Sequence, residues 1–136
     1  MTAAVFDTNV VVSGVLSPAG AAGRILDAIL DGLCRPVVTD RILAEYEEVL
    51  CRPRFRLDSA RVRTLLDALR ARALIAPFTP FKNAHALPDP DDAIFLEAAA
   101  ALGVPIVTGN IKHFPHKSTG GISILSPAAF VARLMG

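Results

Sequence analysis

Carboxylate side chains occur at three points of the sequence where their spacing suits chemistry on a phosphate. Asp7 directly follows the apolar run at residues 3–6, residues 89–92 carry three aspartates, and residues 41–50 carry three glutamates on an amphipathic segment. Carboxylate oxygens, together with water and a substrate phosphate, are the ligands that Mg²⁺ and Mn²⁺ prefer. If these acids converge at one end of a sheet, the site would suit metal-assisted hydrolysis of a phosphodiester bond.

Each group of acids also has a purely structural explanation. Aspartate is a preferred N-cap, so Asp7 would cap a helix that begins at Thr8. Acidic residues in the first turn of a helix are stabilised by the helix dipole, by roughly 0.3–1 kcal/mol each, which would account for residues 89–92. Three neighbouring negative charges still repel one another, and either a bound divalent cation or solvation would relieve that repulsion. Asp92 lies one helical turn before Phe95, near the apolar face, so we expect it to point inward.

The glutamates differ in their position around the predicted helix at residues 41–50. Glu48 falls opposite the apolar face, so we expect it to be exposed to solvent. Glu45 and Glu47 flank the apolar face, one on each side. Periodicity does not choose between them, and solvent exposure explains either one on its own.

The elements that must position these acids alternate between short strands and longer helices. Apolar runs predict strands at residues 3–6, 36–39, 74–78, 104–108 and 122–125. Helical periodicity and capping signals predict helices at residues 8–16, 21–31, 41–50, 59–72, 89–103 and 126–134. This alternation indicates an α/β domain with a mostly parallel sheet. In such sheets, ligands bind beyond the carboxyl ends of the strands, near the switch point where the strand order reverses. Asp7 and residues 108–110 stand at the ends of two predicted strands, which makes them candidates for such a site.

The composition is that of one folded domain without a global charge. The chain has 136 residues, of which 52% are apolar, and a net charge of +1, so any basic surface must be local. No window reaches the ~18 consecutive apolar residues that a membrane anchor needs. Asp7 interrupts the apolar stretch that a signal peptide would require, and we therefore expect a cytoplasmic protein. Cys34 and Cys51 form no metal-binding pair, and we do not expect a disulfide in that compartment.

Local basic charge is concentrated in residues 52–72, which hold seven of the fourteen basic residues. Such clusters hold nucleic-acid backbones, and we predict that Arg52, Arg54 and Arg56 contact RNA. A solvated helix face explains the same pattern. Phe55 is the aromatic residue among these arginines, and a single aromatic does not indicate base stacking.

Two histidines, His113 and His116, are spaced like a helix-borne zinc pair, but Phe114-Pro115 between them favours a loop. No cysteine or acid nearby completes a tetrahedral set, so we expect histidines at the surface or facing substrate rather than zinc ligands.

Four segments together resemble the PIN-domain family. They are Val5-Phe6-Asp7-Thr8-Asn9-Val10-Val11-Val12-Ser13, then Ile42-Leu43-Ala44-Glu45-Tyr46, then Asp89-Pro90-Asp91-Asp92-Ala93-Ile94-Phe95-Leu96, then Ile106-Val107-Thr108-Gly109-Asn110 followed by His113-Phe114. They occur in order and span nearly the whole chain. The sequence is most similar to the PIN proteins of bacteria and archaea that are toxin components of toxin–antitoxin pairs.

This resemblance implies a single Rossmann-like α/β/α domain over residues 1–136, with a central, mostly parallel sheet. It also implies a Mg²⁺- or Mn²⁺-dependent ribonuclease whose acidic residues surround the metal. By position, Asp7, Glu45 and Asp92 match the family's acids, and Asp89 is a nearby additional metal ligand. Thr108 matches the hydroxyl residue after the fourth strand.

Asn110 departs from many relatives, which carry aspartate there. An amide oxygen can accept a hydrogen bond from water but brings no negative charge, so the site would hold three core acids and a second metal would bind more weakly. Asn9 is expected to support the turn at Asp7 by local hydrogen bonding. The departure at Asn110 also supports an alternative, a catalytically weak PIN-like module that acts through protein or RNA binding.

A third interpretation, an unrelated binder of small molecules or phosphate, would need a glycine-rich loop that the sequence lacks. The expected partners are therefore a single-stranded or structured RNA substrate and, by resemblance, an antitoxin protein. Members of the family often dimerise, which makes a homodimer a further expectation.

Overall fold

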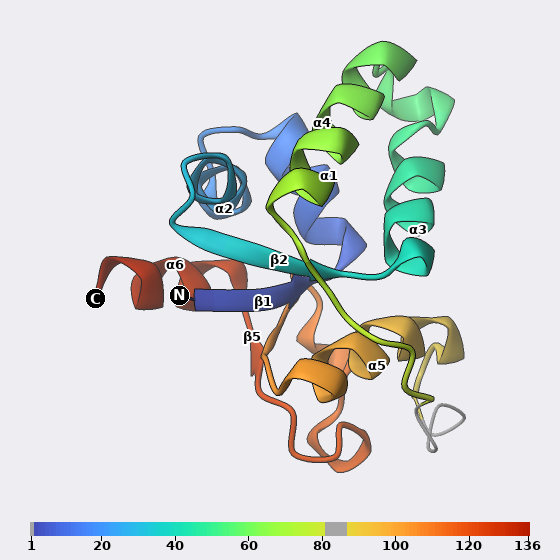
Figure 1. Ribbon diagram of the computed structural model, residues 1–136, viewed down its shortest axis with the longest axis vertical. Coiled ribbons are helices and arrows are strands. Elements are labelled where there is room, and N and C mark those ends of the chain that lie inside the picture. The colour runs from blue at the N-terminus through green and yellow to red at the C-terminus, as the bar shows by residue number, and fades with distance from the viewer. Residues whose placement is uncertain (1, 81–86) are drawn as a thin grey trace.

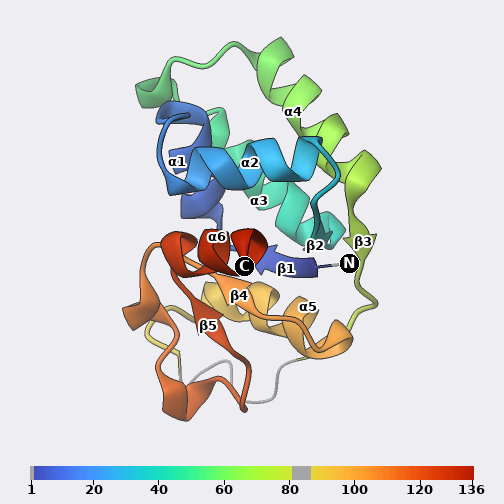
Figure 2. The ribbon, with the colours of Figure 1, turned by 90° about the vertical axis from the view of Figure 1, so that its left-hand side faces the viewer.

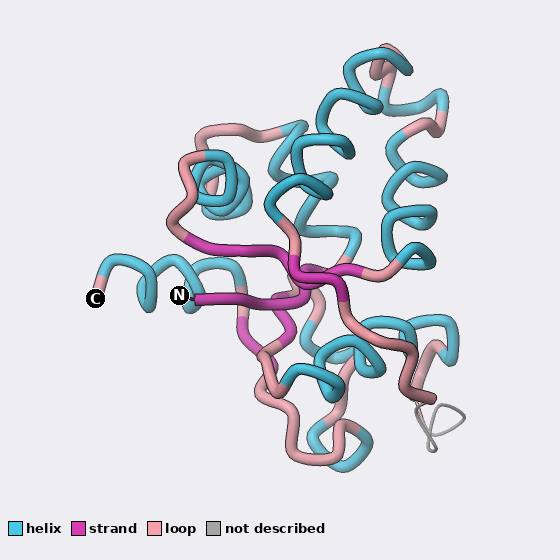
Figure 3. The backbone as a smooth tube through the Cα atoms, in the orientation of Figure 1, coloured by secondary structure: helices cyan, strands magenta, loops and turns pink. Residues whose placement is uncertain are grey.

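The apolar runs of the sequence form a central sheet, and helices follow them along the chain (Figure 3). The computed structural model describes residues 2–80 and 87–136. Its strands are β1 (Thr2–Phe6), β2 (Cys34–Val38), β3 (Leu74–Ile75), β4 (Ile106–Val107) and β5 (Ile124–Leu125). Its α-helices are α1 (Thr8–Leu16), α2 (Ala21–Leu30), α3 (Asp40–Leu50), α4 (Ser59–Arg72), α5 (Ala93–Leu102) and α6 (Pro127–Met135). Short 3₁₀ helices are η1 (Pro53–Phe55), η3 (Pro90–Asp92), η4 (Ile111–His113) and η5 (His116–Ser118).

The sheet is parallel throughout, with the strand order β3-β2-β1-β4-β5. The chain runs outward from β1 through β2 to β3 and then returns to the other side of β1, so the switch point lies between β1 and β4. Phe6 of β1 pairs with Val107 of β4. The residues that follow them, Asp7 and Thr108, are therefore neighbours at the carboxyl edge. The predicted α/β fold with a parallel sheet is confirmed.

Helices cover both faces of this sheet (Figures 1 and 2). Helices α1 to α4 lie on one side and α5 lies on the other, while α6 packs beside α2. The core between these layers is apolar, and the ring of Phe6 meets that of Phe130 edge to face, with centroids 5.4 Å apart. Burying such side chains contributes roughly 1.5–3 kcal/mol each.

Three predicted strands are longer than the observed ones, and two observed strands, β1 and β2, begin earlier than predicted. The run at residues 74–78 pairs only as β3, because Pro77 has no backbone N–H to continue the ladder after Ala76 donates to Val38. Strand β2 begins two residues before Pro36, which is tolerated because β3 pairs only with the last two residues of β2. The last two predicted strands shrink to β4 and β5.

The predicted helix at residues 89–103 is divided into two parts. A 3₁₀ turn, η3, precedes α5, and the side chain of Asp89 accepts a hydrogen bond from the amide of Asp91. Asp89 therefore caps this end, as predicted, but it caps the 3₁₀ turn rather than the α-helix. The turn brings Asp92 to the start of α5 with only 9% of its surface exposed.

Helix α2 packs closely against α1 and against the loop that joins the two helices, because glycines face both contacts. A Cβ atom built on Gly23 would lie 2.0 Å from the carbonyl oxygen of Pro18, and one on Gly14 would lie 2.9 Å from that of Ala22.

Among the described residues, no single helix has the length and apolar character to cross a membrane. Helices α1 and α2 taken together, bent by 95°, pass on length and composition only.

Candidate active site

The switch point of the sheet buries Asp7 in a hydrogen-bonded setting. Asp7 directly follows β1, and its amide donates to the carbonyl of Val107 at 2.9 Å. One carboxylate oxygen, Oδ2, accepts from the Thr108 hydroxyl at 2.7 Å and from the Asn9 side-chain amide at 3.2 Å. Asp7 occupies the N-cap position of α1, yet its side chain makes no capping hydrogen bond. Helix capping therefore does not explain this carboxylate, which is only 5% exposed.

The supporting residues join the start of α1 to the end of β4. Asn9 donates to Asp7 and accepts, through Oδ1, from the amide of Gly109 at 3.0 Å. A Cβ atom on Gly109 would lie 3.3 Å from that oxygen, so the small residue permits the close approach. Asn110 participates through its backbone, which donates to the Thr108 hydroxyl at 3.0 Å. The expected support from Asn9 is thus seen, and it reaches further along the chain than the local turn.

Glu45 and Glu47, which periodicity left equivalent, have different surroundings. Glu45 is half-buried and accepts a hydrogen bond from the hydroxyl of Thr8. The next residue, Tyr46, donates to the carbonyl of Phe6 and so fixes α3 against the end of β1. Glu47 is exposed and lines a separate hollow between α3 and α4. No spacing in the sequence reveals the bond from Thr8, because the two residues are 37 positions apart.

Asp92 presents a buried carboxylate oxygen that has no hydrogen-bond partner among residues 2–80 and 87–136. This atom, Oδ2, lies 3.2 Å from Nδ1 of His113, but the contact does not have the geometry of a hydrogen bond. The side chain of Asp92 points inward, as predicted from its position before Phe95. Asp89 is exposed at the rim of the same hollow. His113, which the sequence placed at the surface or facing substrate, lies against an acid of the site.

These acids line one open hollow of about 600 Å³. Its walls come from the start of α1, from α3, from η1 and η3, and from η4. The lining residues include Asp7, Thr8, Asn9, Glu45, Arg52, Arg54, Phe55, Asp89, Asp92 and His113. We refer to this region as the acidic hollow. Asn110 is not among its lining residues.

Burial and mutual repulsion make it unfavourable for all of these carboxylates to carry charge. Burial raises the pKa of Asp7, and the hydrogen bond from Thr108 offsets part of that rise. Burial, then repulsion from Asp7 and Asp89, raises the pKa of Asp92 to about 6. The pKa of Glu45 is raised as well, first by burial, against the opposing hydrogen bond from Thr8.

The donor chemistry of the acidic hollow fits a hard divalent cation. Three carboxylates would offer oxygen ligands, one oxygen of Asp92 has no hydrogen-bond partner in the part of the chain that the structure describes, and a cation would relieve the repulsion between the charges. Within residues 2–80 and 87–136, however, no three acidic, histidine or cysteine side chains are already arranged around one metal position. Thr8 and Thr108 hold Glu45 and Asp7 in their own hydrogen bonds. Shared coordination therefore requires side-chain movement.

The three arginines predicted to contact RNA are separated by the structure. Arg52 and Arg54 line the acidic hollow, whereas Arg56 does not. Arg52 also pairs with Glu48 at 3.4 Å, one helical turn earlier. The guanidinium of Arg54 lies 4.8 Å from the centre of the Phe55 ring. Among the residues that the structure describes, the two arginines that line the hollow therefore both lie on the side of η1.

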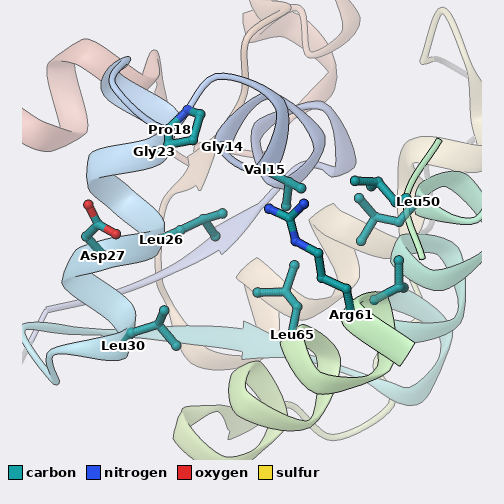
Figure 4. Close-up of a pocket in the computed structure, with 12 residues that line it drawn as sticks. Gly14, Val15, Pro18, Gly23, Leu26, Asp27, Leu30, Leu50, Arg61 and Leu65 are labelled. Carbon is teal, nitrogen blue, oxygen red and sulfur yellow. The ribbon is translucent and has the colours of Figure 1, made fainter. Parts of the chain in front are cut away.

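A second hollow, of about 190 Å³, is chemically different (Figure 4). It lies among α1, α2 and α4 and is lined by aliphatic side chains and glycines, including Gly14, Gly23, Leu26 and Leu65. Arg61 extends from α4 toward Val15 of α1. We refer to this region as the apolar groove.

Comparisons with known proteins agree with this architecture. The sequence matches the PIN domain family over residues 3–112. The uncharacterized protein MJ1680 of Methanocaldococcus jannaschii is 29% identical over 107 residues, which cover 78% of this chain and 69% of that protein. The crystal structure of VapBC2 from Rickettsia felis, bound to a DNA fragment from its promoter, aligns with a TM-score of 0.62 and 15% identity over 92% of this chain and 98% of that one. The structural likeness shows a shared fold.

Proposed function

The chain belongs to the PIN domain family, and from this premise we propose that it is a Mg²⁺- or Mn²⁺-dependent endoribonuclease. PIN domains are generally nucleases that use divalent metal ions. The observation that carries the proposal is the acidic hollow at the switch point, where Asp7, Glu45 and Asp92 line one space. An oxygen of Asp92 is buried there with no hydrogen-bond partner among the described residues.

Each residue of the hollow has a role in this proposal. Asp7, Glu45 and Asp92 would hold the metal ion, with Asp89 as a further ligand at the rim. A bound divalent ion supplies Lewis-acid activation of water and neutralises charge on the scissile phosphate. Thr108 and Asn9 orient Asp7 through the hydrogen bonds to its Oδ2.

On the basic side of the hollow, Arg52 and Arg54 would draw in the RNA backbone, which the carboxylates alone would repel. Arg56 lies outside the lining, so its contribution would come from longer-range attraction only.

We also propose that the protein is the toxin component of a toxin–antitoxin pair and acts on cytoplasmic RNA. Support comes from the fold it shares with VapBC2 over nearly the whole chain. The partner would be an antitoxin protein, and a homodimer is part of the same proposal. Co-expression with the protein encoded by an adjacent gene, followed by size-exclusion chromatography, tests the partnership.

The direct test of activity is incubation of the purified protein with end-labelled single-stranded RNA, with Mn²⁺ or with a chelator. We expect cleavage with Mn²⁺ that the chelator abolishes, and no cleavage by Asp7→Asn, whose melting curve shows that it is folded. Equal cleavage by Asp7→Asn would remove Asp7 from the mechanism. Absence of cleavage together with absence of Mn²⁺ binding by calorimetry would favour the alternative, a module that acts through binding.

A further inference from the structure

The 3₁₀ turn η1 places an aromatic side chain in the acidic hollow. Pro53 opens the turn, and hydrogen bonds from Phe55 to Arg52 and from Arg56 to Pro53, both 3.0 Å, close it. Arg56 then adopts a left-handed conformation with φ 51°, which is uncommon for a residue other than glycine. The turn is thus a short, well-defined support that holds Phe55 beside the acids.

Packing in the core does not account for the position of Phe55. The buried core contains Phe6, Phe95, Phe114 and Phe130, but Phe55 belongs neither to that core nor to the partly buried side chains packed against it. It is half-exposed and lines the acidic hollow. Val12, Leu16 and Val49 line the same hollow, so it offers a ligand both charged groups and an apolar surface.

Arg54 gives this ring a cationic neighbour that has no acidic partner. Its guanidinium lies over the Phe55 ring, and no carboxylate in the described segments, residues 2–80 and 87–136, forms an ion pair with it. An aromatic ring paired with a guanidinium is a surface on which nucleobases stack, and the same guanidinium can contact a phosphate. Because base stacking tolerates any base, the ligand class is an unpaired nucleobase rather than one particular base.

We propose that Phe55 and Arg54 form a nucleobase-binding site that holds an unpaired base next to the phosphodiester positioned at the acids. This inference rests on the proposed function, because it assumes that RNA enters the acidic hollow. Bases in a duplex are stacked on one another and cannot reach the ring, so the site selects single-stranded segments. The site also gives the RNA an orientation, with the phosphate over the carboxylates and the neighbouring base on the side of η1.

The test measures binding without cleavage. A short fluorescein-labelled oligouridylate is titrated with wild-type protein, Phe55→Leu and Phe55→Trp in chelator, and fluorescence anisotropy gives the dissociation constant. Loss of one stacked base predicts that Phe55→Leu binds roughly tenfold more weakly, while Phe55→Trp, which keeps an aromatic face, binds at least as tightly as the wild type. Phe78→Leu is the matched control, because Phe78 is 73% exposed and lies outside the hollow.

Abasic oligonucleotides identify the contact itself. Removing the base at one position of the oligouridylate should weaken binding to the wild type roughly tenfold and leave binding to Phe55→Leu unchanged, because the two changes remove the same stack. The slope of affinity against salt should stay the same in Phe55→Leu and become shallower in Arg54→Gln, which loses a phosphate contact.

The outcomes separate this inference from the proposed function. The nucleobase site is overturned if Phe55→Leu and the wild type bind the oligouridylate with equal affinity, or if an abasic site lowers the affinity equally at every position. Either result counts even if Mn²⁺-dependent cleavage is observed. Position-specific stacking without any cleavage supports the nucleobase site and overturns the nuclease. Absence of binding to the oligouridylate overturns the nucleobase site, whereas the nuclease stands or falls on the Mn²⁺-dependent cleavage assay.

Discussion

The acidic hollow and the apolar groove share one helix, α1, but charge repulsion dominates the first region and close packing dominates the second. Beside the first turn of α1, buried carboxylates repel one another, and within residues 2–80 and 87–136 one oxygen of Asp92 has no hydrogen-bond partner. Further along α1, Gly14 packs against α2, where Gly23 packs against the backbone of Pro18, at distances that leave no room for a Cβ atom. Repulsion between the carboxylates destabilises the folded state at the acidic hollow, whereas close packing stabilises the folded state at the apolar groove. The same kind of small substitution should therefore have opposite consequences in the two regions.

The largest effect is expected for Asp92→Asn in the acidic hollow. The change removes one of the proposed metal ligands and should lower Mn²⁺-dependent cleavage by about 100-fold or more. The same change removes a charge that burial and its acidic neighbours disfavour, so the melting temperature of the metal-free protein should rise. Single-turnover cleavage and thermal melting in chelator measure the two effects.

Asp91→Asn is the matched control for this prediction, because Asp91 is exposed and does not line the hollow. It should keep both the activity and the melting temperature. If Asp92→Asn melted lower than the wild type, the view that charge repulsion dominates this region would be wrong.

The next effect is expected at the contact between α1 and α2. Gly23→Ala would place a Cβ atom 2.0 Å from the carbonyl oxygen of Pro18, so the loop that joins the two helices must move, and we expect a loss of about 2 kcal/mol in the free energy of unfolding. Denaturant titration measures it. Gly20→Ala is the control, because its nearest atom would lie 3.5 Å away. Similar stability of the two variants would show that the close approach does not determine packing here.

A pH dependence of stability should distinguish the acidic hollow from the rest of the molecule. The pKa of Asp92 is raised to about 6 in the folded state from a usual value of 3.8, and the pKa values of Asp7 and Glu45 are raised too. The folded state therefore binds more protons than the unfolded state between about pH 4 and pH 6, so stability falls as the pH rises through this window. His113, beside Asp92, opposes the rise.

Melting of the metal-free protein should thus occur several degrees higher at pH 5 than at pH 7. The difference should shrink in Asp92→Asn and in wild-type protein saturated with Mn²⁺. A melting temperature that is flat over this range would contradict the raised pKa values.

The smallest effect is expected on the basic side of the hollow. Arg54→Glu should weaken binding of single-stranded RNA several-fold, and Arg56→Glu should weaken it less, because Arg54 lines the hollow and Arg56 does not. Anisotropy titrations at two salt concentrations compare them. Equal affinities of both variants and the wild type would favour the view that these arginines form a solvated surface.

Much of the fold could be predicted because strand and helix signals are local. The parallel sheet follows from short apolar runs separated by helices, and Asp89 as a cap follows from Asp-Pro before an acidic turn. Strand ends were predicted less well. Pro77 stops the pairing of β3 because it has no backbone N–H to donate, and the apolar character of residues 74–78 gives no sign of this.

The sequence pattern predicted the placement of a site residue only where that residue directly precedes or follows an apolar element. Asp7 and Asp92 stand directly at the ends of apolar elements, so their inward placement was accessible from the pattern. Periodicity did not separate Glu45 from Glu47; the family resemblance favoured Glu45, and the structure adds its hydrogen bond from Thr8. The support of Asp7 by Thr108, which lies 101 residues further along, is likewise seen only in the structure. Such contacts depend on how elements dock, which periodicity does not encode.

The bond between Asp7 and Thr108 links residues that lie 101 positions apart, across the neighbouring strands β1 and β4. A local opening of β4 away from β1 would therefore also free the carboxylate of Asp7 from the hydroxyl that orients it. The geometry of the candidate site thus depends on the sheet staying closed at this one strand pair.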